Sequence, residues 1–352
     1  MPDRQAVLDI LRPVQDPELR RSLVELNMIR DVEIQDGRVK FTLVLTTPAC
    51  PLREMIVADC KKAVRKLGFQ DIDITVTAET PQAKSLPGRQ GVPGIKNIIA
   101  VSSGKGGVGK STVAVNMAVA LAQSGALVGL LDADIYGPNA PLMLGLEGIR
   151  ATVNKTAAGD ILEPLYNHGV KLVSMSFLID RNQPVVWRGP MLNGIVRNFL
   201  YQTNWGELDY LIVDMPPGTG DVQLTLAQSV PIAGVVIVTT PQEVANLDAR
   251  KGVRMFQQLG VTVLGLVENM SYFVPPDRPD QKYFIFGEGG TEKSALELDI
   301  PVLGYIPLEI SVREGGDQGL PITLTQPESL TAQALHALTQ KVAGLVSVAA
   351  LA

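Results

Sequence analysis

A short stretch rich in glycine and lysine has the residue types needed to bind phosphate. Residues 101–112 read Val-Ser-Ser-Gly-Lys-Gly-Gly-Val-Gly-Lys-Ser-Thr, in which Gly104, Gly109, Lys110 and Ser111 fit the pattern G-x-x-x-x-G-K-[ST]. Glycines at these places let backbone N–H groups turn toward a phosphate without a Cβ in the way. We expect Lys110 to reach the β- and γ-phosphates of a nucleotide and the Ser111 hydroxyl to hold Mg²⁺.

The segments on either side of this stretch are those that a phosphate-binding loop requires. Residues 98–101 are apolar and predict a buried strand, and the Ala-rich run 113–123 predicts a helix. The positive end of that helix favours a bound anion. The expected phosphate-binding residues are therefore Gly104, Lys105, Gly106, Gly107, Val108, Gly109, Lys110, Ser111 and Thr112.

Acidic residues follow two further predicted strands. Asp132 and Asp134 come after the apolar run 127–131, and Asp214 comes after the apolar run 210–213. Ligands of α/β proteins bind at such strand ends, and phosphoryl transfer needs a metal ion and an oriented water. We expect Asp214 to hold Mg²⁺. The Pro-Pro-Gly that follows it resembles a switch segment, in which the Gly218 N–H would sense the γ-phosphate.

The order of predicted elements indicates two domains. Residues 1–79 predict a small α+β domain, and residues 80–96 are a linker rich in Pro and Gly. Residues 97–345 alternate strands with helices, which predicts a doubly wound α/β fold with a mainly parallel sheet, followed by a tail at 346–352. The expected strands after the loop are 127–131, 170–174, 210–213, 234–239, 261–268 and 302–305.

Composition excludes several classes of protein. The 352 residues carry a formal net charge of −5, which argues against a dedicated nucleic-acid binder. The first residues have no apolar signal core, and no run approaches the ~18 apolar residues of a membrane span. We therefore expect a cytoplasmic protein that neither binds nucleic acid nor inserts into a membrane.

The sequence contains two cysteines, Cys50 and Cys60, which is too few for a disulfide framework. Cys50 lies between a predicted strand and a predicted helix, and a cysteine at a helix N-terminus can have a lowered pKa and a reactive thiolate. The other interpretation of Cys50 is a simple buried thiol. Cys60 lies inside the predicted helix and is expected in the core.

Together these motifs resemble the Mrp/ApbC iron–sulfur carrier ATPases, which belong to the MinD/ParA class with a second lysine in the phosphate loop. The resemblance rests on the loop, on Asp132–Pro138, on Asp214–Gly218 and on Trp187–Met191, and it covers nearly the whole chain. Residues 1–79, with Asp16-Pro17-Glu18 and Cys50, resemble the small domain of SufT-like iron–sulfur assembly proteins.

This resemblance implies roles for individual residues. Lys105 would reach across a homodimer interface to the partner's nucleotide, Asp134 would polarise the attacking water, and Asp132 would support the Mg²⁺ shell. Asn269 would read adenine beside Pro307, although both residues also suit plain turn positions. The implied activity is ATP hydrolysis coupled to the binding of an iron–sulfur cluster and its transfer to apoproteins.

One departure from the family bears on the cluster. Many members carry Cys-x-x-Cys after Asn-Met-Ser-Tyr-Phe, but here that segment continues as Val274-Pro275-Pro276-Asp277. Because iron–sulfur clusters are held above all by thiolates, Cys50 becomes the candidate ligand, or the protein docks on a scaffold that holds the cluster. Two other functions stay open: a MinD/ParA-like positioning ATPase, and an ATP-dependent sulfur- or metal-handling scaffold without a bound cluster.

Overall fold

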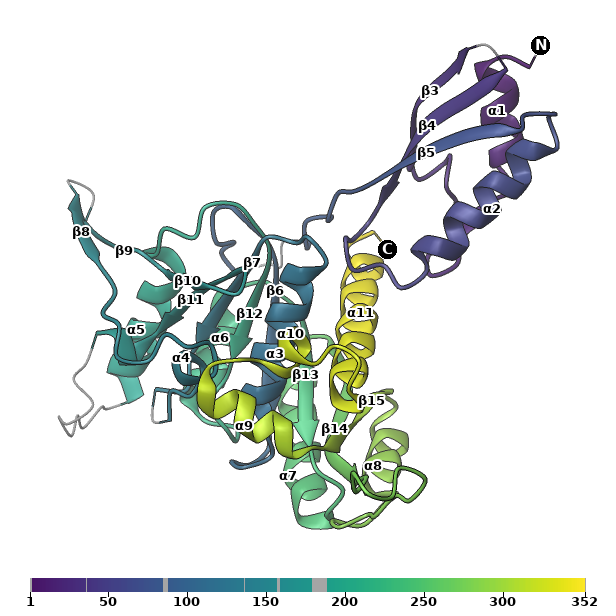
Figure 1. Cartoon of the computed structure of the whole chain (residues 1–352). Coiled ribbons are helices and arrows are strands. Elements are labelled where there is room, and N and C mark those ends of the chain that lie inside the picture. The colour runs from purple at the N-terminus through teal and green to yellow at the C-terminus, as the bar shows by residue number, and fades with distance from the viewer. Residues whose placement is uncertain are drawn as a thin grey trace. The chain divides into compact units, whose positions relative to one another are not determined.

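The computed structural model describes residues 2–35, 37–84, 88–135, 137–156, 159–178 and 189–351. The chain forms two compact units, which Figure 1 shows in the colours of the chain. The smaller unit comprises Met1–Pro81 together with Ala343–Ala352, and the larger comprises Gln82–Val342.

The smaller unit is an α+β fold. Its three-stranded sheet has the order β3-β4-β5, in which β3 and β4 are antiparallel and β4 and β5 are parallel because α2 connects them. Apolar side chains from both helices and the sheet, including Phe41 and Cys60, form its core. Its elements before the second unit are α1 (Arg4–Leu11), β1 (Gln15–Asp16), β2 (Arg21–Ser22), β3 (Ile29–Gln35), β4 (Arg38–Leu45), α2 (Arg53–Arg65) and β5 (Asp71–Ala78).

The larger unit is built on one eight-stranded sheet of order β10-β11-β7-β12-β6-β13-β14-β15. Every neighbouring pair is parallel except the hairpin of β10 and β11. The strands are β6 (Ile95–Ser103), β7 (Val128–Asp132), β10 (Leu165–Asn167), β11 (Val170–Ser174), β12 (Leu208–Asp214), β13 (Ile232–Thr239), β14 (Val263–Phe273) and β15 (Val302–Leu308), and β8 (Val153–Thr156) pairs separately with β9 (Gly159–Leu162).

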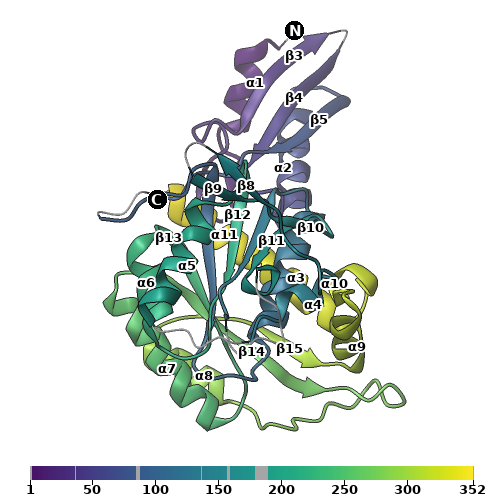
Figure 2. The same ribbon diagram turned by 90° about the vertical axis from the view of Figure 1, so that its left-hand side faces the viewer.

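Helices cover both faces of this sheet, which confirms the predicted doubly wound fold (Figure 2). The helices of one face share a single core with the strands: α5 (Gly189–Tyr201), α6 (Asp221–Ser229), α7 (Glu243–Gln258) and α8 (Gly290–Leu298). The other helical segments are α3 (Lys110–Gln123), α4 (Ala140–Met143), η1 (Met175–Phe177), α9 (Ile310–Gln318), α10 (Ile322–Thr325) and α11 (Leu330–Leu351). Among them α3, which follows the phosphate loop, contacts five strands of the sheet and also α4 and α10.

Burial explains why the central elements read as continuous apolar runs. Residues 98–101 of β6 are at most 3% exposed, as expected for a parallel strand covered on both faces. The apolar residues of α3 from Val113 to Leu121 are likewise buried, and a helix that is apolar all round is a core helix. These two elements therefore hold the phosphate loop between rigid supports.

Two segments differ from the expected domain limits. Residues 82–94 belong to the larger unit: the Arg89 guanidinium donates to the Leu259 carbonyl at 2.6 Å, and the Gln90 N–H donates to the Ser229 carbonyl at 3.0 Å. The expected tail at 346–352 is the end of α11, and residues 343–352 belong to the smaller unit. Within that unit the Ser347 hydroxyl donates to the Thr46 carbonyl at 3.3 Å.

The prediction that nothing in the chain resembles a membrane span needs correction. Helix α11, of 22 residues, is long and apolar enough to cross a membrane by length and composition. One face of this helix nevertheless packs inside the protein: Ala332, Leu335, Leu338, Val342, Ala343 and Val346 are all at most 1% exposed.

The core of the smaller unit can be tested at Phe41, which is fully buried. We expect Phe41→Ala to lower the free energy of unfolding of this unit by about 3–5 kcal/mol, because it loses apolar burial and leaves a cavity. Met55 of α2 is 45% exposed, so Met55→Ala is the matched control and should change stability by less than about 0.5 kcal/mol. Denaturant unfolding followed by circular dichroism measures both, and equal effects would contradict the assigned core.

Candidate functional site

Two glycines of the phosphate loop stand where the chain admits no side chain. Gly109 precedes α3 with φ +83°, in the left-handed region, and a Cβ there would collide with the Asn269 amide. A Cβ on Gly104 would collide with the backbone of α7 at Asp248. Close approach of neighbouring elements, as well as backbone conformation, therefore requires both glycines.

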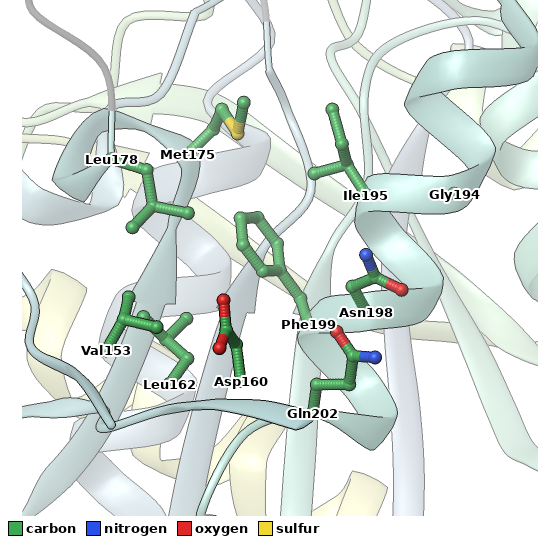
Figure 3. A pocket seen from close by; sticks show the side chains of 10 residues that line it. All are labelled: Val153, Asp160, Leu162, Met175, Leu178, Gly194, Ile195, Asn198, Phe199 and Gln202. Carbon is green, nitrogen blue, oxygen red and sulfur yellow. The ribbon is translucent and has the colours of Figure 1, made fainter. Parts of the chain in front are cut away.

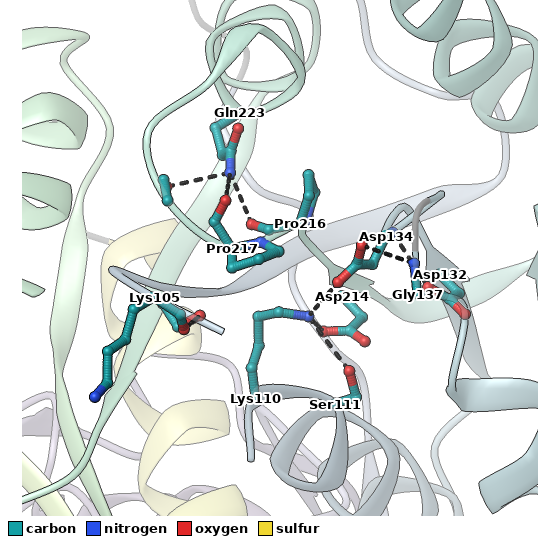
Figure 4. A network of polar contacts seen from close by, with 12 residues as sticks. Lys105, Lys110, Ser111, Asp132, Asp134, Gly137, Asp214, Pro216, Pro217 and Gln223 are labelled. Atoms are coloured by element: carbon teal, nitrogen blue, oxygen red, sulfur yellow. Dashed lines mark hydrogen bonds and ion pairs between the residues drawn. The ribbon is translucent and has the colours of Figure 1, made fainter. Parts of the chain in front are cut away.

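Lys110 is the centre of a buried polar network (Figure 4). Its Nζ donates to Asp214 Oδ1 at 2.5 Å and to Ser111 Oγ at 3.3 Å, and it lies 3.8 Å from Asp134 Oδ2. The Lys110 side chain is only 6% exposed. The structure therefore brings together the lysine, the hydroxyl and two of the carboxylates that the sequence singles out.

The carboxylates come from adjacent parallel strands. Asp132 ends β7 and Asp214 ends β12, and the two residues are register partners. Asp132 accepts hydrogen bonds from the Asp134 N–H at 3.2 Å and from the Ser174 hydroxyl at 3.2 Å. Complete burial and the nearby charge of Asp214 raise the pKa of Asp132 well above its usual range. This edge of the sheet thus has an excess of buried acidic groups.

The same residues suit a magnesium ion. Asp214 Oδ2 is buried and has no hydrogen-bond partner among the described residues, although Oδ1 of the same carboxylate is bonded to Lys110. Mg²⁺ prefers carboxylate, hydroxyl and water oxygens, and Ser111, Asp132 and Asp214 supply oxygens of this kind at one edge. The donor set therefore fits the ion that the sequence predicts.

Hydrogen bonds to Ser103 and Gln223 fix the conformation of the Pro-Pro-Gly segment after β12. The Gly218 N–H donates to the Ser103 carbonyl at 2.8 Å, so it can reach a phosphate only after that bond breaks. Gln223 of α6, 1% exposed, donates through Nε2 to the carbonyls of Pro216 at 2.7 Å, Pro217 at 3.2 Å and Gly218 at 3.1 Å. The sequence analysis did not predict this role for Gln223. The local feature that could have indicated it is an amide side chain in the first turn of the helix that follows the switch segment.

The predicted base-binding residues line one cavity of about 480 Å³ next to the phosphate loop. Gly109 and Thr112 form its loop side, Asn269 comes from the second half of β14, and Pro307 comes from the end of β15. Asn269 Nδ2 donates to the Val108 carbonyl at 2.9 Å. Four residues predicted from three separate stretches of the sequence therefore meet at one cavity.

Other predicted residues lie apart from this network. In Figure 4 the Lys105 ammonium points away from Lys110 and the carboxylates. Arg188 and Trp187 of the Trp-Arg-Gly-Pro-Met motif lie outside the described residues. Gly106 and Gly107 are exposed in the loop.

The expectation of a lowered pKa at Cys50 is wrong. Burial raises the pKa of the Cys50 thiol, and the carboxylates of Glu18 and Asp16 raise it further, although the Leu52 N–H and Arg53 act in the opposite direction. Burial also raises the pKa of Cys60 to about 12. Desolvation therefore outweighs the helix terminus, and neither thiol is activated in this environment.

A second cavity of about 480 Å³ is mainly apolar (Figure 3). The side chains of Met175, Leu162 and Phe199 line it, and among its described lining residues only Asp160 is charged. Its described lining residues include none from the phosphate loop, so it is distinct from the nucleotide site.

Comparisons with known proteins agree across the chain. Residues 94–343 match the family described as NUBPL iron-transfer P-loop NTPase, and residues 4–76 match the family described as iron-sulfur cluster assembly protein. The chain belongs to the NUBPL iron-transfer P-loop NTPase family.

Relatives resemble the chain over three quarters or more of its length. It is 70% identical to an iron-sulfur cluster carrier protein of Synechocystis over 98% of each chain. It is 42% identical to the iron-sulfur cluster carrier protein of Escherichia coli, over 97% of this chain and 91% of the other. It is 48% identical to the mouse iron-sulfur cluster transfer protein NUBPL, over 75% of this chain and 82% of the other.

Solved structures share the fold of the larger unit. A nucleotide-binding protein of Archaeoglobus fulgidus in complex with ADP is 38% identical, with a TM-score of 0.58, over 68% of this chain and 91% of the other. The cell division ATPase MinD of Pyrococcus furiosus, at 23% identity and a TM-score of 0.50 over 70% of this chain and 98% of the other, shares the fold alone.

The glycine requirement predicts a specific defect. We expect Gly109→Ala to weaken ATP binding at least roughly tenfold, because the added Cβ meets Asn269 and the left-handed backbone is strained. Gly148 also has positive φ, +75°, but open space around it, so Gly148→Ala is a control for strain alone. Calorimetric titration with ATP and Mg²⁺ measures both variants, and equal affinities would contradict the tight approach of Asn269.

The raised pKa of Cys50 predicts slow alkylation. Because the thiolate reacts and the thiol does not, the rate with iodoacetamide should be well below that of a free cysteine at pH 7–8. It should still be rising at pH 9, the ordinary thiol value, since the folded-state pKa lies above it. Mass spectrometry of the native protein measures the rate, and Cys50→Ala shows any contribution from Cys60. Rapid alkylation that levels off below pH 8 would mean that Cys50 is activated after all.

Proposed function

We propose that this protein is an ATP-hydrolysing carrier that binds iron–sulfur clusters and transfers them to apoproteins. The main support for ATP hydrolysis is that Lys110, Asp134 and Asp214 lie together. Lys110 Nζ is 2.5 Å from Asp214 Oδ1 and 3.8 Å from Asp134 Oδ2. Support for the cargo comes from the relatives, which are named iron-sulfur cluster carriers and align over nearly the full chain.

The residues of the site divide the work of phosphoryl transfer. Backbone N–H groups of the loop and the N-terminus of α3 bind the phosphates. Lys110 exchanges part of its contact with Asp214 for the phosphate oxygens, and Asp134 orients the attacking water and accepts its proton. Bound Mg²⁺ would neutralise the charge that develops on the phosphate oxygens, held by Ser111 and Asp214 with support from Asp132. Gly218 gives up the Ser103 carbonyl when its N–H turns to the γ-phosphate.

The second loop lysine points to a homodimer as the working form. Lys105 extends away from its own Lys110, as Figure 4 shows, and so does not complete the site in its own protomer. In a homodimer, the Lys105 ammonium would reach the partner's nucleotide across the interface. There it would stabilise the negative charge that develops on the phosphate.

The cargo must be held with few thiolates. The sequence has only two cysteines, and Cys60 is fully buried in the core of the smaller unit. Cys50 is partly exposed and is the remaining thiol for a cluster. Because clusters take about four thiolate ligands, one Cys50 from each of two protomers leaves positions for ligands of a scaffold or a client. The cluster is therefore held transiently, between donor and acceptor.

Removal of the central lysine should stop turnover. We expect Lys110→Ala to lower the rate of ATP hydrolysis by at least about 10²–10³-fold, since a preorganised charge on the transferred phosphate is lost. Lys96, which pairs with Asp209 at 2.8 Å elsewhere in the larger unit, provides the control Lys96→Ala with near wild-type rate. Phosphate release measures turnover, and a wild-type rate for Lys110→Ala would exclude this lysine from the reaction.

Mixing two inactive variants tests the dimer. Lys105→Ala and Lys110→Ala should each be nearly inactive. When they are mixed, each mixed dimer has one site with Lys110 from one protomer and Lys105 from the other. We expect up to half of the wild-type rate per mixed dimer. No recovery on mixing, with exchange of subunits confirmed by mass spectrometry, would contradict action across an interface.

The cargo is tested by anaerobic reconstitution followed by iron and sulfide counting. We expect a labile cluster that passes to an apo-ferredoxin, and transfer that is lost in Cys50→Ala while its ATP hydrolysis stays within about twofold of wild type. Cys60→Ala is the matched control and should still transfer. A wild-type protein that takes up no iron would favour a role as a scaffold-docking ATPase without cargo of its own.

A further inference from the structure

The amide of Asn269 is held in one orientation by the phosphate loop. Its Nδ2 donates to the Val108 carbonyl at 2.9 Å, and a carbonyl can only accept, so the NH₂ group must face the loop. No described residue donates to Oδ1 of this amide, which leaves that oxygen for a ligand in the cavity that Asn269 lines. An amide oxygen accepts a hydrogen bond from the amino group of adenine but not from the carbonyl oxygen at the same position of guanine or hypoxanthine.

The strand that carries Asn269 is irregular at this point. Asn269 pairs with Ile306 and Phe273 with Leu308, so β14 advances four residues where β15 advances two. Met270, inside this irregularity, has φ +55°, a left-handed conformation that a non-glycine residue adopts only at a cost. Bulges of this kind redirect the side chains beside them, and here the redirected side chain is the base-facing amide.

A buried side-chain bridge spans the left-handed residue. The Ser271 hydroxyl donates to Glu268 Oε1 at 2.6 Å, and the two residues are 4% and 2% exposed. The other oxygen of Glu268 is buried and has no hydrogen-bond partner among the described residues. A buried carboxyl group with one unpaired oxygen is unfavourable by itself, so the hydrogen bond from Ser271 offsets part of the cost of burying Glu268.

We propose that the Glu268–Ser271 bridge and the left-handed Met270 position the Asn269 amide, and thereby set the preference of the site for adenine over 6-oxopurines. Glu268, Met270 and Ser271 are positioning residues that act through Asn269. This inference rests on the proposed function, because it deepens the nucleotide site of the proposed ATPase.

The test compares the affinities for ATP and inosine triphosphate, which has a carbonyl oxygen in place of the amino group. Wild type should bind ATP more tightly than inosine triphosphate. Ser271→Ala should lower the ratio of the two affinities roughly tenfold, which corresponds to one well-made hydrogen bond. Glu268→Gln retains an acceptor oxygen and should retain the ratio. Ser294→Ala removes a buried serine whose hydroxyl donates to the Gly290 carbonyl in α8, and it serves as the matched control with unchanged ratio.

Met270 supplies a second comparison. Met270→Val and Met270→Gly both remove the thioether, but only glycine adopts positive φ without strain. Met270→Gly should therefore keep the selectivity for ATP, and Met270→Val should lose it. Thermal unfolding without nucleotide reports stability separately, and if Met270→Val does not fold, the comparison of Ser271→Ala with Glu268→Gln decides.

The outcomes separate this inference from the proposed function. Tight ATP binding with wild-type selectivity in Ser271→Ala and Met270→Val overturns the positioning role alone. Equal loss of affinity for both triphosphates in these variants also overturns it, because a general structural defect does not distinguish the bases. A wild-type protein that binds neither triphosphate overturns the proposed ATPase and this inference with it.

Discussion

The nucleotide site depends on one ammonium group among buried carboxylates. Asp132 and Asp214 are fully buried at neighbouring strand ends, and Asp134 lies close by. The Lys110 ammonium contacts Asp134 and Asp214 directly. Its charge also lowers the pKa of Asp132, but burial and the charge of Asp214 raise that pKa by more. One cation cannot balance three carboxylates, and removing one partner of a buried pair is costly. The remaining negative charge is what a divalent cation, brought in with a triphosphate, would neutralise.

Local signals in the sequence sufficed for the elements that carry this network. The apolar run 170–174 is β11 with the same limits, and the run before the phosphate loop is the central part of β6. Both predictions succeed because strands covered on two faces are apolar throughout and short. The predicted strand that ends at 268 continues to Phe273, however, and that extension depends on pairing of Phe273 with Tyr283, a contact made outside the strand. Phe273 also pairs with Leu308 of β15 across a shift in register, and such irregular pairing leaves no periodic signal.

Where the predictions failed, a distant contact outweighed a local rule. The place of Cys50 before α2 favours a thiolate, but burial and two upstream carboxylates raise its pKa. The Pro- and Gly-rich segment 82–94 reads as a linker, yet Arg89 and Gln90 bind carbonyls of the larger unit. Gln223 gathers three carbonyls of the switch segment, and that role is set by the folded path of the Pro-Pro-Gly backbone, which composition does not encode.

Two backbone carbonyl groups of residues 101–112 connect the switch segment at one end of the nucleotide site with the base cavity at the other. The Ser103 carbonyl, before the loop, accepts from the Gly218 N–H of the switch segment, and the Val108 carbonyl accepts from the Asn269 amide at the base cavity. In the proposed site, a γ-phosphate would compete only for the Gly218 N–H, because the Asn269 amide is held by its NH₂ group and would receive the base through its oxygen. The base end would therefore stay fixed while the switch end changed partner on the proposed hydrolysis. In the proposed ATPase, a fixed base with a movable switch would let the protein keep its nucleotide while it changed shape. A shape change tied to the γ-phosphate is what ATP would then supply to a carrier that alternately holds and releases its cargo.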